Sequence, residues 1–231
     1  MGHESNNLII VGAGETAEIA FEYFSHDSKY EIKGFSVEKD FLKCDTLFNL
    51  PVIPFEEIER YYPPGDFKVF VAISFVQLNR IRTRLYKAAK VKGYSLATYI
   101  SSKAFVWHNA EIGENCFIFE NNVIQHKVKV GNNVILWCGS CVDHQTVIRD
   151  NCFFSSHVVI PGFCDIGENC FMGANACLRD HIKIAKDNII GAGAVVIRDT
   201  QEGKIYFGNP AKPHGNIDSF KGFNVKKNRI I

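Results

Sequence analysis

The sequence predicts a small α/β domain followed by an all-β parallel β-helix. Three observations support this fold class. Strand-like apolar segments alternate with helical segments over the first hundred residues. Beyond them, a large apolar residue recurs at every sixth position and a turn-like tetrapeptide at every eighteenth. We expect the α/β domain over residues 1–100 and the β-helix, with a C-terminal tail, over residues 101–231.

The N-terminal domain is predicted from strands and helices that follow one another in turn. Such alternation implies a small parallel sheet. Strands are expected at residues 8–14, 30–37 and 67–74, and helices at residues 15–24 and 76–93, the second of them basic, amphipathic and capped by Gly93.

The first strand runs into a turn of the form G-x-G-x-x-A, from Gly12 to Ala17. Glycines there allow backbone N–H groups at a helix N-terminus to approach a ligand phosphate. The same pattern also suits an ordinary tight turn between a strand and a helix, so both interpretations remain open.

The second half is governed by a period of six. Sixteen consecutive sixth positions, from Val106 to Val196, hold an aliphatic or large apolar residue. Four residues after most of them stands a small or β-branched residue, and Cys116, Cys152, Cys164 and Cys170 are of this kind. Neither a helix nor an ordinary strand has this period. It is typical of a β-solenoid, whose stacked coils bury one continuous core.

A second period, of eighteen, indicates coils with three flat sides. The tetrapeptides IGEN, VGNN, IRDN, IGEN and IAKD begin at residues 112, 130, 148, 166 and 184. Each ends in Asn or Asp, which tolerate left-handed backbone. The motif therefore marks one corner of each coil, and residues eighteen apart should stack at a strand spacing of about 4.8 Å.

Composition excludes several classes of partner. The formal charge of +1 gives no reason to expect nucleic acid, and no apolar run reaches the ~18 residues of a membrane span. Eight cysteines without a recognisable signal peptide favour reduced thiols and a cytoplasmic location. Cys138 and Cys141 form a C-x-x-C pair with no second pair, so we expect no metal site.

Histidines supply the candidate for acid–base chemistry. His108, His126 and His144 are eighteen residues apart and stand two positions after an inward residue, so they should point outward along one edge. His144 lies in the middle coils beside Asp143, and His157 lies on another side of the next coil. A histidine can act as a general base because its ordinary pKa is near 6.5. A surface role for the three stacked histidines is the alternative interpretation.

Several longer motifs show a resemblance to a known family. They are VGAGETAEIA, NNVILWCGSCVDHQTVI, IGENCFMGANACLRD, IIGAGAVVIRDT and FGNPAKP. In these motifs the chain resembles the nucleotide-amino-sugar N-acetyltransferases of the sialic-acid O-acetyltransferase-like family, over residues 8–213. The resemblance implies a Rossmann-like domain joined to a left-handed β-helix with hexapeptide repeats. It also implies a homotrimer that uses acetyl-CoA and a dTDP-, UDP- or GDP-linked amino sugar in bacterial surface-glycan (lipopolysaccharide O-antigen) biosynthesis.

The resemblance also assigns the catalytic residues. The family's general base falls on His144. The acidic residue that follows this base in some members is Gln145 here, so Asp143 or a residue of another subunit is expected to serve instead. A histidine that meets the thioester oxygen in some members falls on Phe153, which cannot donate a hydrogen bond. His157 is the candidate to replace it.

The same resemblance assigns the binding residues. Contacts to the pantetheine arm of acetyl-CoA fall on Ala174, Ala192 and Gly193. Contacts to the nucleotide sugar fall on Gly12, Gly14, Glu15, Thr16, Glu38 and Ser74. Of two acidic residues that some members place after the second strand, Glu38 is matched, whereas the other position is Val37.

Other classes of function account for parts of the sequence. An NAD-dependent enzyme would explain the glycine turn but leave the β-helix without a role. A γ-carbonic-anhydrase-like zinc enzyme needs two histidines close in sequence, and His144 and His157 are thirteen positions apart. Sialic-acid-type O-acetylation and a non-catalytic trimeric binding module remain as alternatives.

Overall fold

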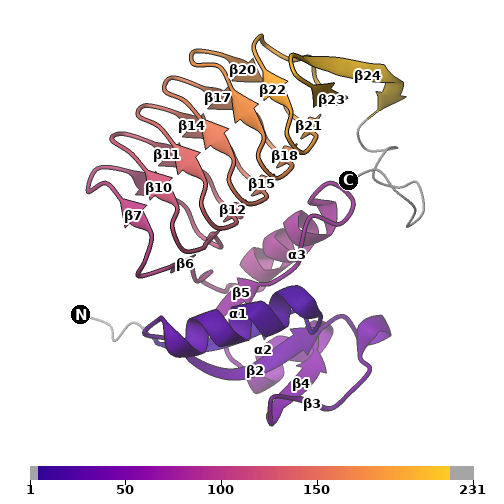
Figure 1. Ribbon diagram of the computed structural model, residues 1–231. Coiled ribbons are helices and arrows are strands. Elements are labelled where there is room, and N and C mark those ends of the chain that lie inside the picture. Colours follow the sequence, from indigo (N-terminus) through magenta and orange to yellow (C-terminus); the bar gives the residue numbers. More distant parts are fainter. Residues whose placement is uncertain (1–4, 219–231) are drawn as a thin grey trace. The chain divides into compact units, whose positions relative to one another are not determined.

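The structure, a computed structural model, describes residues 5–218, and side chains as far as residue 214. The chain forms two compact units (Figure 1). Of the described residues, the first unit comprises 5–74 and 81–99, and the second comprises 75–80 and 100–218. The short segment 75–80 thus leaves the N-terminal unit and belongs to the second, which the sequence did not predict.

The first unit is a small α/β fold around a five-stranded sheet in the order β3-β4-β2-β1-β5. Neighbours are parallel except that β3 runs antiparallel to β4. The strands are β1 (Asn7–Val11), β2 (Glu31–Val37), β3 (Thr46–Leu47), β4 (Leu50–Pro54) and β5 (Lys68–Val71). The helices are α1 (Glu15–His26), α2 (Ile58–Tyr61) and α3 (Arg80–Val91), with short 3-10 turns at Lys39–Phe41 and Phe55–Glu57.

The predicted helix at 76–93 begins four residues late. Gln77, Leu78 and Asn79 have left-handed φ values of 52°, 48° and 65°, and the helix starts at Arg80. Leu78 is fully buried, and the Asn79 amide lies 3.4 Å from the main-chain oxygens of Asn169 and Cys170. These tertiary contacts override the helical pattern of the segment.

The second unit is a parallel β-helix built from short strands in three sheets. The first sheet holds β6 (Tyr99–Ile100), β9 (Phe117–Ile118), β12 (Ile135–Leu136), β15 (Phe153–Phe154), β18 (Phe171–Met172), β21 (Ile189–Ile190), β23 (Lys204–Gly208) and β24 (Ala211–Asp218). The second holds β7 (Phe105–Val106), β10 (Val123–Ile124), β13 (Cys141–Val142), β16 (Val159–Ile160), β19 (Cys177–Leu178) and β22 (Val195–Val196). The third holds β8 (Glu111–Ile112), β11 (Lys129–Val130), β14 (Val147–Ile148), β17 (Asp165–Ile166) and β20 (Lys183–Ile184).

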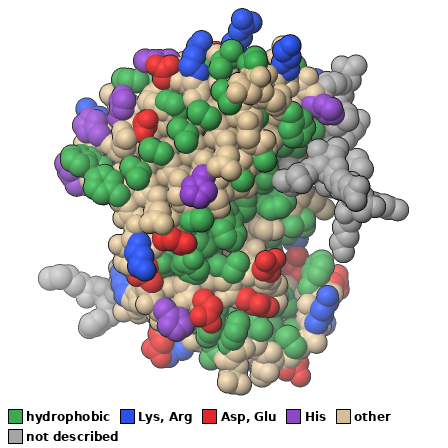
Figure 2. Space-filling view, in the orientation of Figure 1, with side chains coloured by type: hydrophobic (Ala, Val, Ile, Leu, Met, Phe, Trp, Pro, Cys, Tyr) green, Lys and Arg blue, Asp and Glu red, His purple; other side chains and the backbone are tan. Residues whose placement is uncertain are grey.

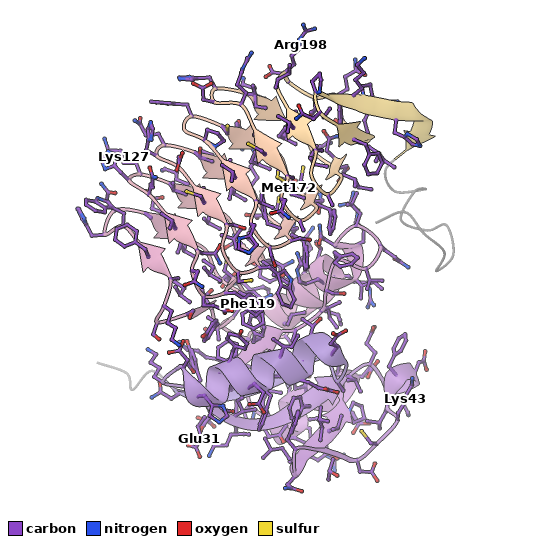
Figure 3. The ribbon with its side chains drawn as sticks, viewed as in Figure 1. Glu31, Lys43, Phe119, Lys127, Met172 and Arg198 are labelled. Carbon is purple, nitrogen blue, oxygen red and sulfur yellow. The ribbon has the colours of Figure 1, made fainter. Side chains whose placement is uncertain are left out.

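The predicted register of eighteen is confirmed in every sheet of the β-helix. Val130 pairs with Ile148, and Ile148 pairs with Ile166 in the next coil. The second residue of each two-residue strand points inward, as Met172 does in Figure 3. Every predicted inward residue from Ile118 to Val196 is buried, and Val106 and Ile112 at the open end are partly buried. The small inward positions predicted for the cysteines are buried as well.

One edge of the coils, between the third and first sheets, carries a ladder of asparagines. The predicted corner residues Asn115, Asn133, Asn151, Asn169 and Asp187 have φ values of 54°, 57°, 65°, 57° and 60°. The Asn115 Nδ2 donates to Asn133 Oδ1, and the Asn133 Nδ2 to Asn151 Oδ1, each over 2.8 Å. These side chains therefore join successive coils in addition to the backbone ladder.

Asn122 breaks the rule of small apolar inward residues and is still fully buried. Its Nδ2 donates to the Phe119 and Leu136 carbonyl oxygens, and its Oδ1 accepts from the Ser140 N–H. A buried amide is tolerated here because its hydrogen bonds are satisfied.

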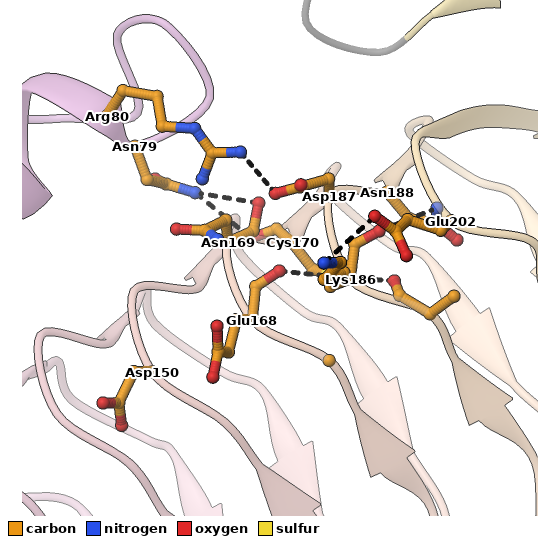
Figure 4. Close-up of polar contacts among 12 residues, drawn as sticks. Asn79, Arg80, Asp150, Glu168, Asn169, Cys170, Lys186, Asp187, Asn188 and Glu202 are labelled. Carbon is orange, nitrogen blue, oxygen red and sulfur yellow. Dashed lines mark hydrogen bonds and ion pairs between the residues drawn. The ribbon is translucent and has the colours of Figure 1, made fainter.

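The segment 75–80 docks on the first sheet of the β-helix (Figure 4). The Phe75 ring contacts the rings of Phe153 and Phe171 at 4.9 and 5.0 Å between centroids. The Arg80 Nη2 forms an ion pair with Asp187 Oδ1 at 2.6 Å. None of the helices in residues 5–218 combines the length and apolar character of a membrane span.

The ladder predicts a stability difference between two asparagines. Asn133→Ala should lower the free energy of unfolding by about 1–3 kcal/mol more than Asn121→Ala, because it breaks two buried hydrogen bonds. Asn121 has the same left-handed backbone, with φ 58°, but an exposed side chain. Urea denaturation followed by circular dichroism measures both, and equal losses would show that the ladder adds nothing to stability.

Candidate functional site

His144 lies on the edge between the second and third sheets of the β-helix, in the middle coils. It is exposed, and its main-chain N–H lies 3.3 Å from Gln125 Oε1. The ring meets Phe163 in the following coil at 5.2 Å between centroids, with the two planes at 88°. His108 and His126 occupy the same edge in earlier coils, because β10 pairs in register with β7 and β13.

Asp143 precedes His144 in the sequence, but its carboxylate is hydrogen-bonded to other residues. Its Oδ1 accepts hydrogen bonds from Gln125 Nε2 at 2.7 Å and from the Cys141 thiol at 3.2 Å. Among residues 5–214 the structure gives no hydrogen bond between Asp143 and the His144 ring. Within one chain, therefore, the predicted acidic partner does not hold the imidazole.

Neither cysteine of the C-x-x-C pair forms a disulfide. All eight cysteines are free. Burial, the hydrogen bond to Asp143 and the charge of that carboxylate raise the pKa of Cys141 to about 11. Cys138 Sγ lies 3.4 Å from Ser156 Oγ. In the described part of the chain no three His, Cys, Asp or Glu side chains are arranged to hold a metal ion.

Ala174 and Ala192 lie on the opposite edge of the second sheet, where it meets the first. Each is the second residue of a four-residue turn, at 173–176 and 191–194, and the N–H of Gly193 donates back to Ala174 O at 2.8 Å. Within the described residues the N–H groups of Ala174 and Ala192 donate to no protein acceptor. They form two stacked donors that can bind an amide-rich ligand arm.

His157 lies on this same edge, two coils before Gly193. It is exposed, with a φ of 60°, and its ring rests against Gly139. A Cβ atom on Gly139 would come within 2.5 Å of the ring, so glycine makes room for the histidine. His157 thus lies on the predicted cofactor edge of the second sheet, whereas His144 lies on the other edge of that sheet.

Phe153 is placed differently from the other predicted cofactor residues. It points outward from the first sheet, stacks on Phe171 at 5.6 Å and is only 4% exposed, because Phe75 covers it. The Phe153 ring packs against Phe75 and Phe171, and it lies beside neither His144 nor Ala174.

The outer face of the second sheet is apolar from end to end. The first residue of each strand points outward, and these residues are Phe105, Val123, Cys141, Val159, Cys177 and Val195. The corresponding positions of the third sheet are mostly charged, namely Glu111, Lys129, Val147, Asp165 and Lys183. Figure 2 shows hydrophobic side chains at the surface of the coils, with histidines beside them.

Trp137 lies at the edge between the first and second sheets and stacks on Phe119, with 4.4 Å between ring centroids. The apolar outer face of the second sheet was not predicted from the sequence. Its outward residues recur at a period of eighteen, and this pattern would have revealed the face. Its place between the edges of His144 and Ala174 makes it part of the candidate site.

In the first unit, the predicted turn joins β1 to α1. Gly12 has a φ of 126°, and a Cβ atom there would lie 2.7 Å from Ala72 O, so only glycine fits. Gly14 is the N-cap of α1, and a Cβ atom on it would meet nothing within 4 Å. Glu15 and Thr16 open the helix, where N–H groups lack helical partners and favour an anion.

Glu38 and Ser74 follow the strands on either side of β1. The carboxyl ends of β1, β2 and β5 share one edge of the sheet, because these strands are parallel neighbours. Glu38 accepts hydrogen bonds from Nη1 and Nη2 of the Arg84 guanidinium at 2.6 and 2.8 Å, and this hydrogen bonding lowers the pKa of Glu38. The Ser74 carbonyl accepts from buried Arg82 at 3.0 Å.

Comparison with known proteins shows that the chain is similar to transferases of this architecture. Residues 109–144 match the family described as bacterial transferase hexapeptide (six repeats). A mutant of perosamine N-acetyltransferase from Caulobacter crescentus, in complex with CoA and GDP-perosamine, is 26% identical, with a TM-score of 0.83 over 91% of this chain and 97% of that chain.

A second solved structure is similar over the same length. The acetyltransferase domain of PglB from Neisseria gonorrhoeae, in complex with acetyl coenzyme A, is 26% identical, with a TM-score of 0.81 over 91% of this chain and 100% of that chain. The predicted resemblance is confirmed. Both matches span nine-tenths of this chain and so include both units. No curated protein sequence matches the chain.

The geometry at Cys141 predicts an unreactive thiol. With a pKa of about 11, fewer than roughly one Cys141 in a thousand is thiolate at pH 7.5, and only the thiolate reacts with iodoacetamide. Exposed Cys44 should be alkylated much faster. Peptide mapping by mass spectrometry after a short labelling pulse measures both sites, and comparable labelling of the two would contradict the assignment.

Proposed function

We propose that the protein transfers the acetyl group of acetyl-CoA to the amino group of a nucleotide-linked amino sugar. One observation carries this proposal. An exposed histidine and two stacked backbone donors lie on the two edges of one apolar sheet, in a fold shared with enzymes solved with CoA and GDP-perosamine. The eight free cysteines accord with a cytoplasmic enzyme that supplies surface-glycan precursors.

His144 is the proposed general base. A sugar ammonium must lose a proton before or during its attack on the thioester, and a neutral imidazole in the site can accept that proton. The attack forms a tetrahedral oxyanion, which a backbone N–H can stabilise. No acyl-enzyme is required, because a thioester is already activated, and protonated Cys141 is not equipped to form one.

Acetyl-CoA is proposed to lie along the edge of Ala174, Ala192 and Gly193. The free N–H groups of the two alanines are spaced by one coil and can donate to the amides of the pantetheine arm. His157 lies toward the middle coils on this edge, where it can meet the thioester end. Small side chains keep the edge open to a long ligand.

The nucleotide sugar is proposed to bind at the Rossmann-like first unit, beside the turn from Gly12 to Thr16. The helix N-terminus there suits a diphosphate. No protein atom would oppose a side chain at Gly14, so that space is free for a ligand. Ionised Glu38, fixed by Arg84, is placed to accept a hydrogen bond from the ribose or the base.

A homotrimer is proposed because one chain cannot complete the site. His144 and Ala174 lie on different edges of the second sheet. In a cyclic trimer of parallel prisms, the first edge of one protomer meets the second edge of its neighbour. The apolar outer face between these edges supports such an interface, because a monomer would leave it in water.

The function is tested with acetyl-CoA and a panel of dTDP-, UDP- and GDP-linked amino sugars, with free sialic acid as the O-acetylation control. Against the accepted amino sugar, His144→Asn should lower kcat by about 10²-fold or more, since loss of a general base costs 10²–10⁴. Acetyl-CoA affinity should be retained. Cys138→Ser serves as the silent control. If sialic acid were the only substrate turned over, the protein would be an O-acetyltransferase and the proposed reaction would be wrong. A wild-type kcat in His144→Asn would show that His144 is not the general base.

The apolar face predicts the oligomeric state. Light scattering should give about three times the 26.0 kDa of one chain. Val159→Glu, at a position that is 39% exposed, should yield monomers, because it places charge at the centre of the interface. Val147→Glu is the matched control at the same strand position of the charged third sheet. A trimer that survives Val159→Glu would place the interface elsewhere.

A further inference from the structure

Within the described residues of one chain, no acidic side chain is hydrogen-bonded to the His144 imidazole. The inference drawn from this rests on the proposed role of that ring as general base. Asp143 is bonded to Gln125 and Cys141. Gln145 follows His144 with left-handed backbone, at φ 57°, and an amide carries no negative charge. Some other group must fix the orientation of the ring if it is to accept a proton in a defined direction.

Two residues one coil onward, Gly162 and Phe163, lie against the ring. A Cβ atom on Gly162 would lie 2.7 Å from His144 Nε2 and 2.8 Å from Cε1, so the imidazole occupies the space that any other residue would fill. The Phe163 ring stands at 88° to the imidazole with centroids 5.2 Å apart, which is a favourable edge-to-face contact. Together these two residues limit the space available to the ring on two of its sides.

Phe163 is itself braced from the next coil. Its ring stacks on that of His181, with centroids 4.6 Å apart and planes at 10°. The rings of His144, Phe163 and His181 therefore follow one another along this edge, each one coil from the next. This row fixes Phe163 in the orientation that meets His144.

The fold does not require phenylalanine at this position. Phe163 is the third residue of its turn, with a left-handed φ of 59°, a conformation that is unfavourable for a bulky residue. Equivalent corners on this and other edges hold Lys127, Asn121 and Asn175, with φ values of 54° to 58°. Its ring is 43% exposed and so contributes only in part to the core. An unfavourable backbone paired with an exposed ring beside the proposed base indicates selection for function rather than for stability.

We propose that Phe163 and Gly162 are positioning residues, which orient the His144 imidazole in place of the missing acidic partner. Gly162 leaves room for Nε2, and Phe163 limits rotation of the ring about its Cβ–Cγ bond. Neither residue takes part in proton transfer.

The test separates positioning from folding. Phe163→Asn should lower kcat about tenfold or more, because a misoriented base transfers protons poorly, while the KM for acetyl-CoA stays unchanged. Its melting temperature should be equal to or above that of the wild type, because Asn suits left-handed backbone. Phe163→Tyr keeps the ring and should keep kcat within about threefold of the wild-type value. Lys127→Asn, at the same turn position two coils earlier, is the control and should leave kcat unchanged.

A double mutant shows whether Phe163 acts through His144. In a His144→Asn background, Phe163→Asn and Gly162→Ala should cause no further loss of kcat, because the ring that they orient is gone. Wild-type kcat in Phe163→Asn, or a full additional loss in the double mutant, would overturn the proposal. So would an equal loss in Phe163→Asn and Phe163→Tyr.

Imidazole NMR separates this inference from the proposed function. Replacing Phe163 by Asn should shift the His144 Cε1–H resonance, through loss of the neighbouring ring current, and broaden it as the ring gains freedom. If the wild-type protein transfers no acetyl group, the proposed function fails, yet the resonance still reports whether Phe163 holds the ring. An unchanged His144 resonance in Phe163→Asn would overturn the positioning role whatever the activity.

Discussion

The parallel pairing of residues eighteen positions apart is the interaction on which the β-helix depends. Each two-residue strand is too short to be stable alone, and its hydrogen bonds go to the coils above and below. Ile148, for example, pairs with Val130 on one side and Ile166 on the other. Because the register never slips, a side chain at a given turn position always meets the one eighteen residues onward.

This register also creates the candidate site. It sets His144 against Gly162 and Phe163 on one edge, and it aligns the free N–H groups of Ala174 and Ala192 on the other. The two edges belong to the same sheet, whose outer face is apolar. In the proposed homotrimer, assembly would complete a site divided in this way, and burial of the apolar face and formation of the proposed active site would be one event.

The left-handed corners of the coils show how stability and function share one backbone. Where the corner serves only the fold, as at Asn133, the residue suits the conformation and its side chain joins the coils. At Phe163, beside the proposed base, a bulky residue occupies the same conformation although it suits that backbone poorly. The two kinds of corner have the same backbone geometry and differ in what their side chains contact.

The sequence by itself determined the coil, its inward residues and the left-handed corners, because these follow from local periods of six and eighteen. Tertiary structure alone decided the docking of residues 75–80, which buries Phe153 and shortens the predicted helix. It also decided that Asp143 bonds to Gln125 rather than to His144. A sequence period predicts which positions face one another. It does not predict which hydrogen-bond partner a polar side chain has, because that depends on all the neighbours competing for it in the folded structure.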